Sequence, residues 1–156
     1  MTLTAADDVV KSNRVDGNKI AVFGGSHGGF LTTHLIAMFG VSDIPDWCFC
    51  ESGFEFKHKS LADENVLKDA WKKSPLQYVD QVKTPIIVML GCGDRRVPPK
   101  QGEEYYKALK ARDVKCRLIA YEGNCHPIIK VDSEADAFVN MMDWFTQNLD
   151  IPVTDI

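Results

Sequence analysis

Three short apolar runs stand out along the chain, at residues 19–23, 84–90 and 117–121, and each leads into glycine or other turn residues. Runs of this length with such boundaries indicate buried strands. The second run contains Ile-Ile-Val-Met-Leu without alternating polar residues. That continuity is typical of a strand in a parallel sheet whose two faces are both covered by helices.

Segments with a helical spacing of apolar residues follow these runs. Residues 30–38 can continue from the first run as a helix, and residues 99–111 form a second helix with one apolar face. A third helix begins with Ser133 as its N-cap, and its apolar stripe is expected to pack on the core. The alternation of strands and helices predicts a single parallel α/β domain over residues 1–156. The stripe of the third helix comprises Ala135, Phe138, Val139, Met142, Phe145 and Leu149, and further helical stretches are expected over residues 5–13 and 63–71.

Composition and charge narrow the class of protein. The chain has 156 residues, of which 45% are hydrophobic and 26% are charged, the balance of an ordinary soluble domain. Its net charge of −4 argues against nucleic acid or an anionic membrane as a partner. The first residues lack the basic start and apolar centre of a signal peptide. The number of cysteines, five, is odd, and their spacing is not that of a disulfide-rich scaffold, which indicates free thiols in a reducing cytoplasm.

The most informative stretch follows the first apolar run. Gly24-Gly25-Ser26-His27-Gly28 matches the G-x-S-x-G pattern of a nucleophile elbow, a tight turn between a strand and a helix. The glycines are needed because Cβ atoms beside the strained serine would collide with the adjoining elements. The turn exposes the Ser26 hydroxyl and directs the His27 amide toward a developing oxyanion. The alternative is a glycine-rich turn without a chemical role.

Three residues with complementary chemistry follow three different apolar runs, namely Ser26, Asp94 and His126. Functional groups in parallel α/β sheets lie beyond the carboxyl ends of the strands, and Ser…Asp…His is the chain order of the α/β-hydrolases. In such a triad Ser26 attacks, His126 acts as base and then as acid, and Asp94 orients the imidazole. Taken singly, Asp94 could instead cap a turn and His126 could be a solvated loop residue. A metal site of Cys92, Cys125 and His126 is a much weaker alternative.

Several longer blocks carry a family resemblance. They lie at residues 24–30, 43–48, 74–78, 82–85 and 94–98. These blocks resemble the catalytic domain of the acylaminoacyl-peptidases, a branch of the prolyl oligopeptidase family of serine peptidases. The resemblance implies a cytosolic hydrolase, without cofactor or metal, that releases an N-acylated residue from short blocked peptides and often forms homo-oligomers. By position it assigns the triad to Ser26, Asp94 and His126 and the oxyanion hole to the His27 amide.

Two departures from the family pattern affect the expected fold. The resemblance begins just before the nucleophile strand, without the β-propeller or the earlier strands of the sheet. The chain is also short between the elbow helix and Asp43, where family members have a strand that lies between the nucleophile strand and the aspartate strand. The predicted fold is therefore a partial α/β-hydrolase, truncated on its N-terminal side and lacking one strand after the nucleophile helix.

The missing strand allows two structural outcomes. If the strand at residues 86–90 slides into the vacant position, the Asp94 loop moves by about 4.8 Å, which is enough to break an Asp–His hydrogen bond. If the strand does not slide, backbone edges stay unpaired inside the sheet.

Three functional hypotheses follow. The first is a serine hydrolase of the acylaminoacyl-peptidase kind, which acts through an acyl-enzyme on Ser26. The second is a truncated, catalytically silent isoform that pairs with full-length subunits through an exposed sheet edge. The third is a small esterase similar to dienelactone hydrolase, with the same triad and a non-peptide ester as its substrate.

Overall fold

The structure is a computed structural model that describes residues 2–26, 28–29, 32, 53 and 64–151. In chain order its elements are α1 (Thr2–Lys11), α4 (Glu64–Lys72), the 3-10 helix η1 (Leu76–Gln81), β1 (Ile86–Gly91), α5 (Pro99–Lys110), β2 (Cys116–Tyr121) and α6 (Val131–Asn148). The helices expected near residues 5–13, 63–71 and 99–111 are present as α1, α4 and α5. The helix expected over residues 30–38 lies largely outside the described residues. No helix in the described ranges is long and apolar enough to cross a membrane.

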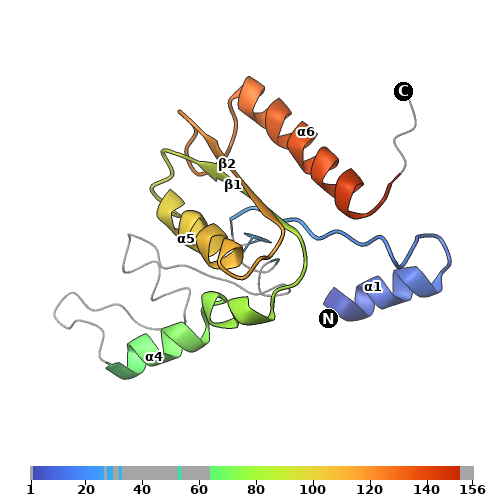
Figure 1. Ribbon diagram of the computed structural model, residues 1–156, viewed down its shortest axis with the longest axis horizontal. Coiled ribbons are helices and arrows are strands. Elements are labelled where there is room, and N and C mark those ends of the chain that lie inside the picture. The colour runs from blue at the N-terminus through green and yellow to red at the C-terminus, as the bar shows by residue number, and fades with distance from the viewer. Residues whose placement is uncertain (1, 27, 30–31, 33–52, 54–63, 152–156) are drawn as a thin grey trace.

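The described part of the sheet consists of β1 and β2, which pair in parallel from Ile86 opposite Cys116 to Gly91 opposite Tyr121. Parallel neighbours need a crossover connection, which α5 supplies. Helix α5 covers one face of this sheet and α6 the other (Figure 1). The prediction of a parallel α/β arrangement with a doubly covered strand at residues 86–90 is therefore confirmed.

The core lies between η1, α5 and the start of β1. Helix α5 begins at Pro99, whose fixed φ suits the first helical position. Tyr105 and Leu109 are four residues apart and so share the helix face that reaches the core, where Leu109 is 0% exposed. This packing fixes β1 relative to α5, and it thereby places the loop that follows β1. The buried cluster comprises Val79, Val82, Ile86, Tyr105, Leu109 and Val114.

Residues 19–23 do not form a strand, so this part of the sequence prediction is wrong. The backbone there is irregular, and the side chains of Ile20 and Phe23 are 51% and 72% exposed. A strand requires a neighbour for its N–H and C=O groups. In the part of the chain that the structure describes, no backbone hydrogen bond joins residues 20–24 to β1. The local pattern is that of a strand, but these residues have no sheet partner.

Helix α6 begins earlier than its sequence pattern predicts. Its first residue is Val131, and the preceding residue, Lys130, provides no side-chain cap. Ser133 is therefore not the N-cap. Its hydroxyl instead accepts a hydrogen bond from Nδ2 of the buried Asn124 at 2.8 Å. A competing tertiary partner has replaced the local capping interaction.

The apolar stripe of α6 is also less buried than expected. Phe138, Val139 and Met142 are 57%, 59% and 57% exposed, whereas Trp144 is buried. The prediction that the stripe packs on the core is therefore wrong for these three residues. The physical reason lies in the described part of the sheet, because its two strands do not extend beneath the whole apolar face of an 18-residue helix.

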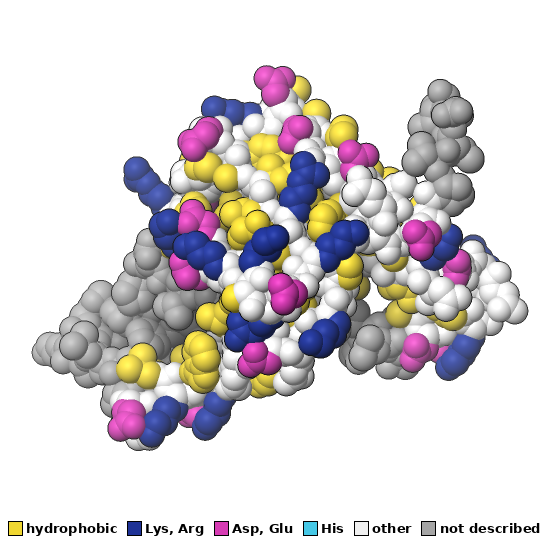
Figure 2. All heavy atoms as spheres, in the orientation of Figure 1, with side chains coloured by type: hydrophobic (Ala, Val, Ile, Leu, Met, Phe, Trp, Pro, Cys, Tyr) yellow, Lys and Arg dark blue, Asp and Glu magenta, His cyan; other side chains and the backbone are white. Residues whose placement is uncertain are grey.

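Charged side chains of both signs are interspersed over the face seen in Figure 2, with apolar patches between them. Several form ion pairs along single helices, such as Lys68–Glu64 at 2.6 Å and Lys107–Glu104 at 2.9 Å. Exposed pairs of this kind contribute little to stability. The surface charges therefore favour solubility and leave the positioning of the site to the core and the loops.

Candidate active site

Ser26 occupies the tight turn that its glycine-rich surroundings predict. Its φ is +55°, in the left-handed region that residues other than glycine seldom adopt. Gly24 must lack a side chain, because a Cβ there would overlap the carbonyl group of Gly28. Residues 28, 29 and 32 are helical. The turn and the helix start of a nucleophile elbow are therefore present, although the segment before them is not paired as a strand.

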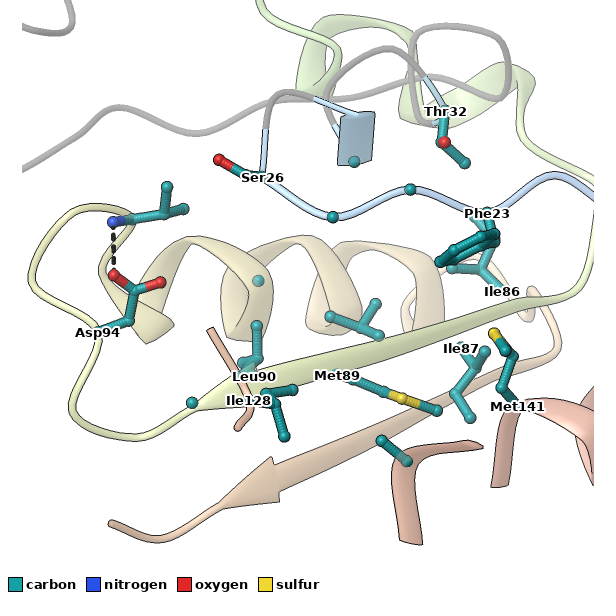
Figure 3. Close-up of a pocket in the computed structure, with 18 of the residues that line it drawn as sticks. Phe23, Ser26, Thr32, Ile86, Ile87, Met89, Leu90, Asp94, Ile128 and Met141 are labelled. Carbon is teal, nitrogen blue, oxygen red and sulfur yellow. Dashed lines mark hydrogen bonds between the residues drawn. The ribbon is translucent and has the colours of Figure 1, made fainter. Parts of the chain in front are cut away.

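Asp94 lies in the loop after β1 and is held by that loop. Its Oδ1 accepts hydrogen bonds from the backbone N–H groups of Arg96 at 2.8 Å and Val97 at 2.9 Å, and Figure 3 draws one of these bonds. They orient the carboxylate so that Oδ2 lies 2.8 Å from Nδ1 of His126. Asp94 therefore caps a turn and faces His126 at the same time, so its two sequence-based interpretations are compatible.

His126 lies in the loop after β2, which Asn124 anchors. The side chain of Asn124 accepts hydrogen bonds from the backbone N–H groups of Ile129 and Lys130 at 3.2 and 3.0 Å. The backbone carbonyl of Asn124 accepts a hydrogen bond from the N–H of Gly93 at 2.8 Å. This last bond ties the His126 loop directly to the Asp94 loop, so the two loops are positioned together.

The same two loops approach each other most closely at Gly91, the last residue of β1. A Cβ at this position would overlap the carbonyl oxygen of Cys125, so only glycine fits. Sequence reasoning missed the roles of both Gly91 and Asn124. The available signals were a glycine at the end of an apolar run and an asparagine two residues before the histidine.

His126 is hydrogen-bonded through both ring nitrogens. Nδ1 lies 2.8 Å from Oδ2 of Asp94, and Nε2 lies 2.8 Å from Oγ of Ser26. An ionised carboxylate only accepts, so Nδ1 carries the proton and Nε2 accepts from the Ser26 hydroxyl. In this relay of three side chains, His126 and Asp94 are 21% and 10% exposed, so their contact is mostly shielded from water, whereas Ser26 is exposed. The structure brings the three predicted residues together, and the Asp94 loop has not moved away from His126.

Neither the Cys92 thiol nor a metal cluster competes with this relay in the described ranges. Burial, and then the nearby Glu122, raise the pKa of the Cys92 thiol, which favours its unreactive protonated form. No group of three His, Cys, Asp or Glu side chains among the described residues is arranged to hold a metal ion, which leaves the weak alternative of a metal site without support. The predicted oxyanion donor, the amide of His27, lies outside the described residues.

A cavity of about 670 Å³ opens beside the relay. The cavity lies between residues 22–26 on one side and β1 on the other (Figure 3). Side chains of α5 and α6 contribute to its walls. Ser26, Asp94 and His126 all line it, and Figure 3 shows Ser26 and Asp94 at one end. The remaining lining is mostly apolar, so the cavity favours an apolar group or segment.

A sequence profile of the prolyl oligopeptidase family matches residues 2–151. The chain belongs to this family. It is 42% identical to the acylamino-acid-releasing enzyme of Rattus norvegicus over 93% of this chain and 22% of that enzyme. The acylamino-acid-releasing enzyme of Homo sapiens is 41% identical over the same shares of both chains. This member of the family thus spans about a fifth of the length of these curated relatives.

Solved structures share the fold of this family member. A puromycin-hydrolyzing peptidase of Mycobacterium tuberculosis matches with a TM-score of 0.78 and 24% identity, over 96% of this chain and 25% of that chain. The acylaminoacyl peptidase of Pyrococcus horikoshii matches with a TM-score of 0.72 and 19% identity, over 96% of this chain and 27% of that chain. The chain therefore has part of an α/β-hydrolase fold.

The comparison with the relatives also shows an internal difference in length. The match to the Rattus norvegicus enzyme extends over 165 positions, whereas 93% of the 156 residues of this chain is about 145 residues. That enzyme therefore carries about 20 residues within the matched region that have no counterpart here. This difference is as long as a strand with its connections.

Proposed function

We propose that this chain is a serine hydrolase that releases an N-acylated residue from short blocked peptides through an acyl-enzyme on Ser26. The observation that carries the proposal is the continuous hydrogen-bonded relay from Asp94 through His126 to Ser26. The printed names of the relatives, acylamino-acid-releasing enzymes, supply the substrate class. The proposed setting is the cytoplasm, and the chemistry needs no cofactor.

In the proposed reaction, Oγ of Ser26 attacks the carbonyl carbon of the acylated residue while its proton passes to Nε2 of His126. Asp94 holds the ring in the required tautomer and stabilises the imidazolium that forms. The C–N bond breaks as Nε2 gives this proton to the leaving amine, and the acylated residue remains as an ester on Ser26. Water then attacks this ester, with His126 again accepting a proton. The released product is the free N-acylated amino acid.

The turn at Ser26 determines which backbone amide can stabilise the negative charge that develops on the carbonyl oxygen of the substrate. In an elbow, the amide after the nucleophile faces the carbonyl oxygen of the substrate. We therefore assign the His27 amide as an oxyanion donor. Such donors act on the tetrahedral state, and loss of one typically lowers kcat by about 10²–10³.

The geometry favours a hydrolase over a catalytically silent isoform. A non-glycine residue in the left-handed region costs about 1–3 kcal/mol and is retained where the strain serves a role. Ser26 is in this region together with Asn13, Asp113 and Asp150, but Asn and Asp adopt it more readily than serine, and the Ser26 hydroxyl lies within hydrogen-bond distance of His126. The esterase hypothesis shares this relay and differs in the leaving group, so substrates separate the two.

The proposal is tested by steady-state hydrolysis of N-acetyl-alanyl p-nitroanilide and p-nitrophenyl acetate. We expect the amide to be hydrolysed, with kcat lowered at least about 10⁴-fold in Ser26→Ala. Ser12→Ala is the matched control, because the Ser12 hydroxyl donates to the carbonyl of Val9 at the end of α1. Turnover of the ester without the amide would favour the esterase, and equal rates in Ser26→Ala would contradict both hydrolase hypotheses.

A further inference from the structure

The cavity beside the relay lies along the edge of β1 that faces away from β2, and we call the space between residues 22–25 and β1 the strand slot. One edge of β1 pairs with β2 along all six residues. On the opposite edge, facing the slot, no described segment forms a backbone hydrogen bond with β1. Because successive residues of a strand direct their N–H and C=O groups to alternate edges, about half of these groups in β1 point toward the slot.

The far side of the slot is a second open edge. The segment that carries Phe23 and Ser26 runs alongside β1 in the same direction (Figure 3). Among the described residues, its stretch from residue 20 to residue 24 forms no backbone hydrogen bond with β1. An extended segment lying between them would therefore meet a partner edge on both sides.

The walls of the slot are apolar on both faces. Gly102 and Tyr105 contribute from α5, and Phe138, Met141 and Trp144 contribute from α6. Figure 3 shows Met141 beside Ile87, below the plane of β1. A strand that is covered on both faces needs a continuously apolar sequence rather than an alternating one. The chemistry of the slot thus specifies the side chains of its occupant as well as its backbone.

We propose that the strand slot binds an extended, continuously apolar strand of about six residues that a different protein presents. The length follows from β1, whose six residues span about 20 Å at 3.3 Å per residue. The relatives carry about 20 residues without a counterpart here, enough for such a strand and its connections. A lipid acyl chain would fill the apolar space but leave the backbone groups on both edges unpaired, which is unfavourable. A peptide strand satisfies both requirements.

This proposal is independent of the hydrolase activity, and binding alone tests it. The probe is a synthetic peptide with six central Val, Ile and Ala residues between lysine pairs. Two matched peptides keep the same side chains and carry N-methyl groups on alternate amides. One peptide is methylated on the amides that would face β1, and the other on the amides that would face residues 20–24. We expect the unmodified peptide to raise the Tm of the full chain in a saturable manner. Each methylated peptide is expected to bind at least tenfold more weakly, because both edges pair.

Helix α6 offers a matched pair of variants. Phe138 and Val139 are 57% and 59% exposed, and only Phe138 lines the slot. Phe138→Asp is expected to weaken peptide binding at least tenfold, whereas Val139→Asp leaves it unchanged. Both side chains are exposed, so neither change is expected to prevent folding.

Three results would overturn the proposal. The first is the absence of binding at millimolar peptide. The second is equal binding of the methylated peptides, or equal protection by decanoate, which would show apolar filling without strand pairing. The third is a dimer by sedimentation equilibrium that binds no peptide, which would show that a second copy of this chain, rather than a different protein, occupies the slot.

Discussion

Replacing Asn124 with alanine is expected to loosen the loop that carries His126. The residue is 2% exposed, and its side chain accepts hydrogen bonds from the N–H groups of Ile129 and Lys130. It also donates to the hydroxyl of Ser133 at 2.8 Å. Alanine removes these three interactions and a longer hydrogen bond of 3.4 Å to the carbonyl of Glu122, while the backbone carbonyl that meets the Asp94 loop remains.

The size of this effect follows from the groups left without a partner. An unsatisfied buried polar group costs about 1–3 kcal/mol. Ile129 and Lys130 are exposed residues, so water replaces part of what their N–H groups lose. We therefore expect the free energy of unfolding to fall by about 2–3 kcal/mol. A loop that holds His126 less firmly also lowers the fraction of molecules with an assembled relay, so serine labelling should slow about tenfold.

The assay combines urea unfolding with the rate of labelling by a fluorophosphonate. Asn140→Ala is the control, because the amide of Asn140 donates to the backbone and side chain of Asp136 on α6, away from the His126 loop. Its expected change is within about 0.5 kcal/mol, with labelling unaffected. If Asn124→Ala matched this control in both stability and labelling, the role assigned to Asn124 would be refuted.

Three further predictions concern the packing around the site. Gly91→Ala should lower stability and slow fluorophosphonate labelling together, because the added Cβ overlaps the carbonyl of Cys125; unchanged labelling would count against the close approach of the two loops. Leu109→Ala should lower the unfolding free energy by about 2–5 kcal/mol in urea titrations, because the side chain is fully enclosed, and a loss below 1 kcal/mol would contradict its place in the core. Burial, and then the hydrogen bond to Asp136, raise the pKa of Tyr121 to about 12, whereas an unfolded tyrosine titrates near 10. The neutral hydroxyl therefore stabilises the fold below pH 10, by up to about 2–3 kcal/mol, and this contribution is lost as the pH rises to 12. The stability difference between the wild type and Tyr121→Phe should shrink over that range, and a constant difference would disprove the shift.

The parts of the fold that depend on local pattern could be predicted from the sequence. The continuous run at residues 86–90 predicted a doubly covered parallel strand, and β1 has that structure. The placement of Asp94 and His126 after two neighbouring strands predicted that the residues meet, because parallel strands end at the same edge of a sheet. The 2.8 Å contact between them follows from this topology.

The parts that depend on distant partners could not be predicted in this way. Residues 19–23 have the composition of a strand, yet a strand needs a neighbour, and the neighbour is set by other parts of the chain. The two described strands likewise leave Phe138 exposed on a helix whose stripe indicated burial. The capping pattern at Ser133 failed because Asn124, nine residues earlier, uses its hydroxyl.

The measurement that tests the central claim most directly is fluorophosphonate labelling of the purified, folded chain, followed by mass spectrometry to locate the label. The account predicts a single label on Ser26, none in Ser26→Ala, and a rate at least about 10³-fold lower in His126→Ala. A chain that is folded by circular dichroism but remains unlabelled would contradict the claim. An unchanged rate in His126→Ala would do so as well, because Ser26 would then react without the relay.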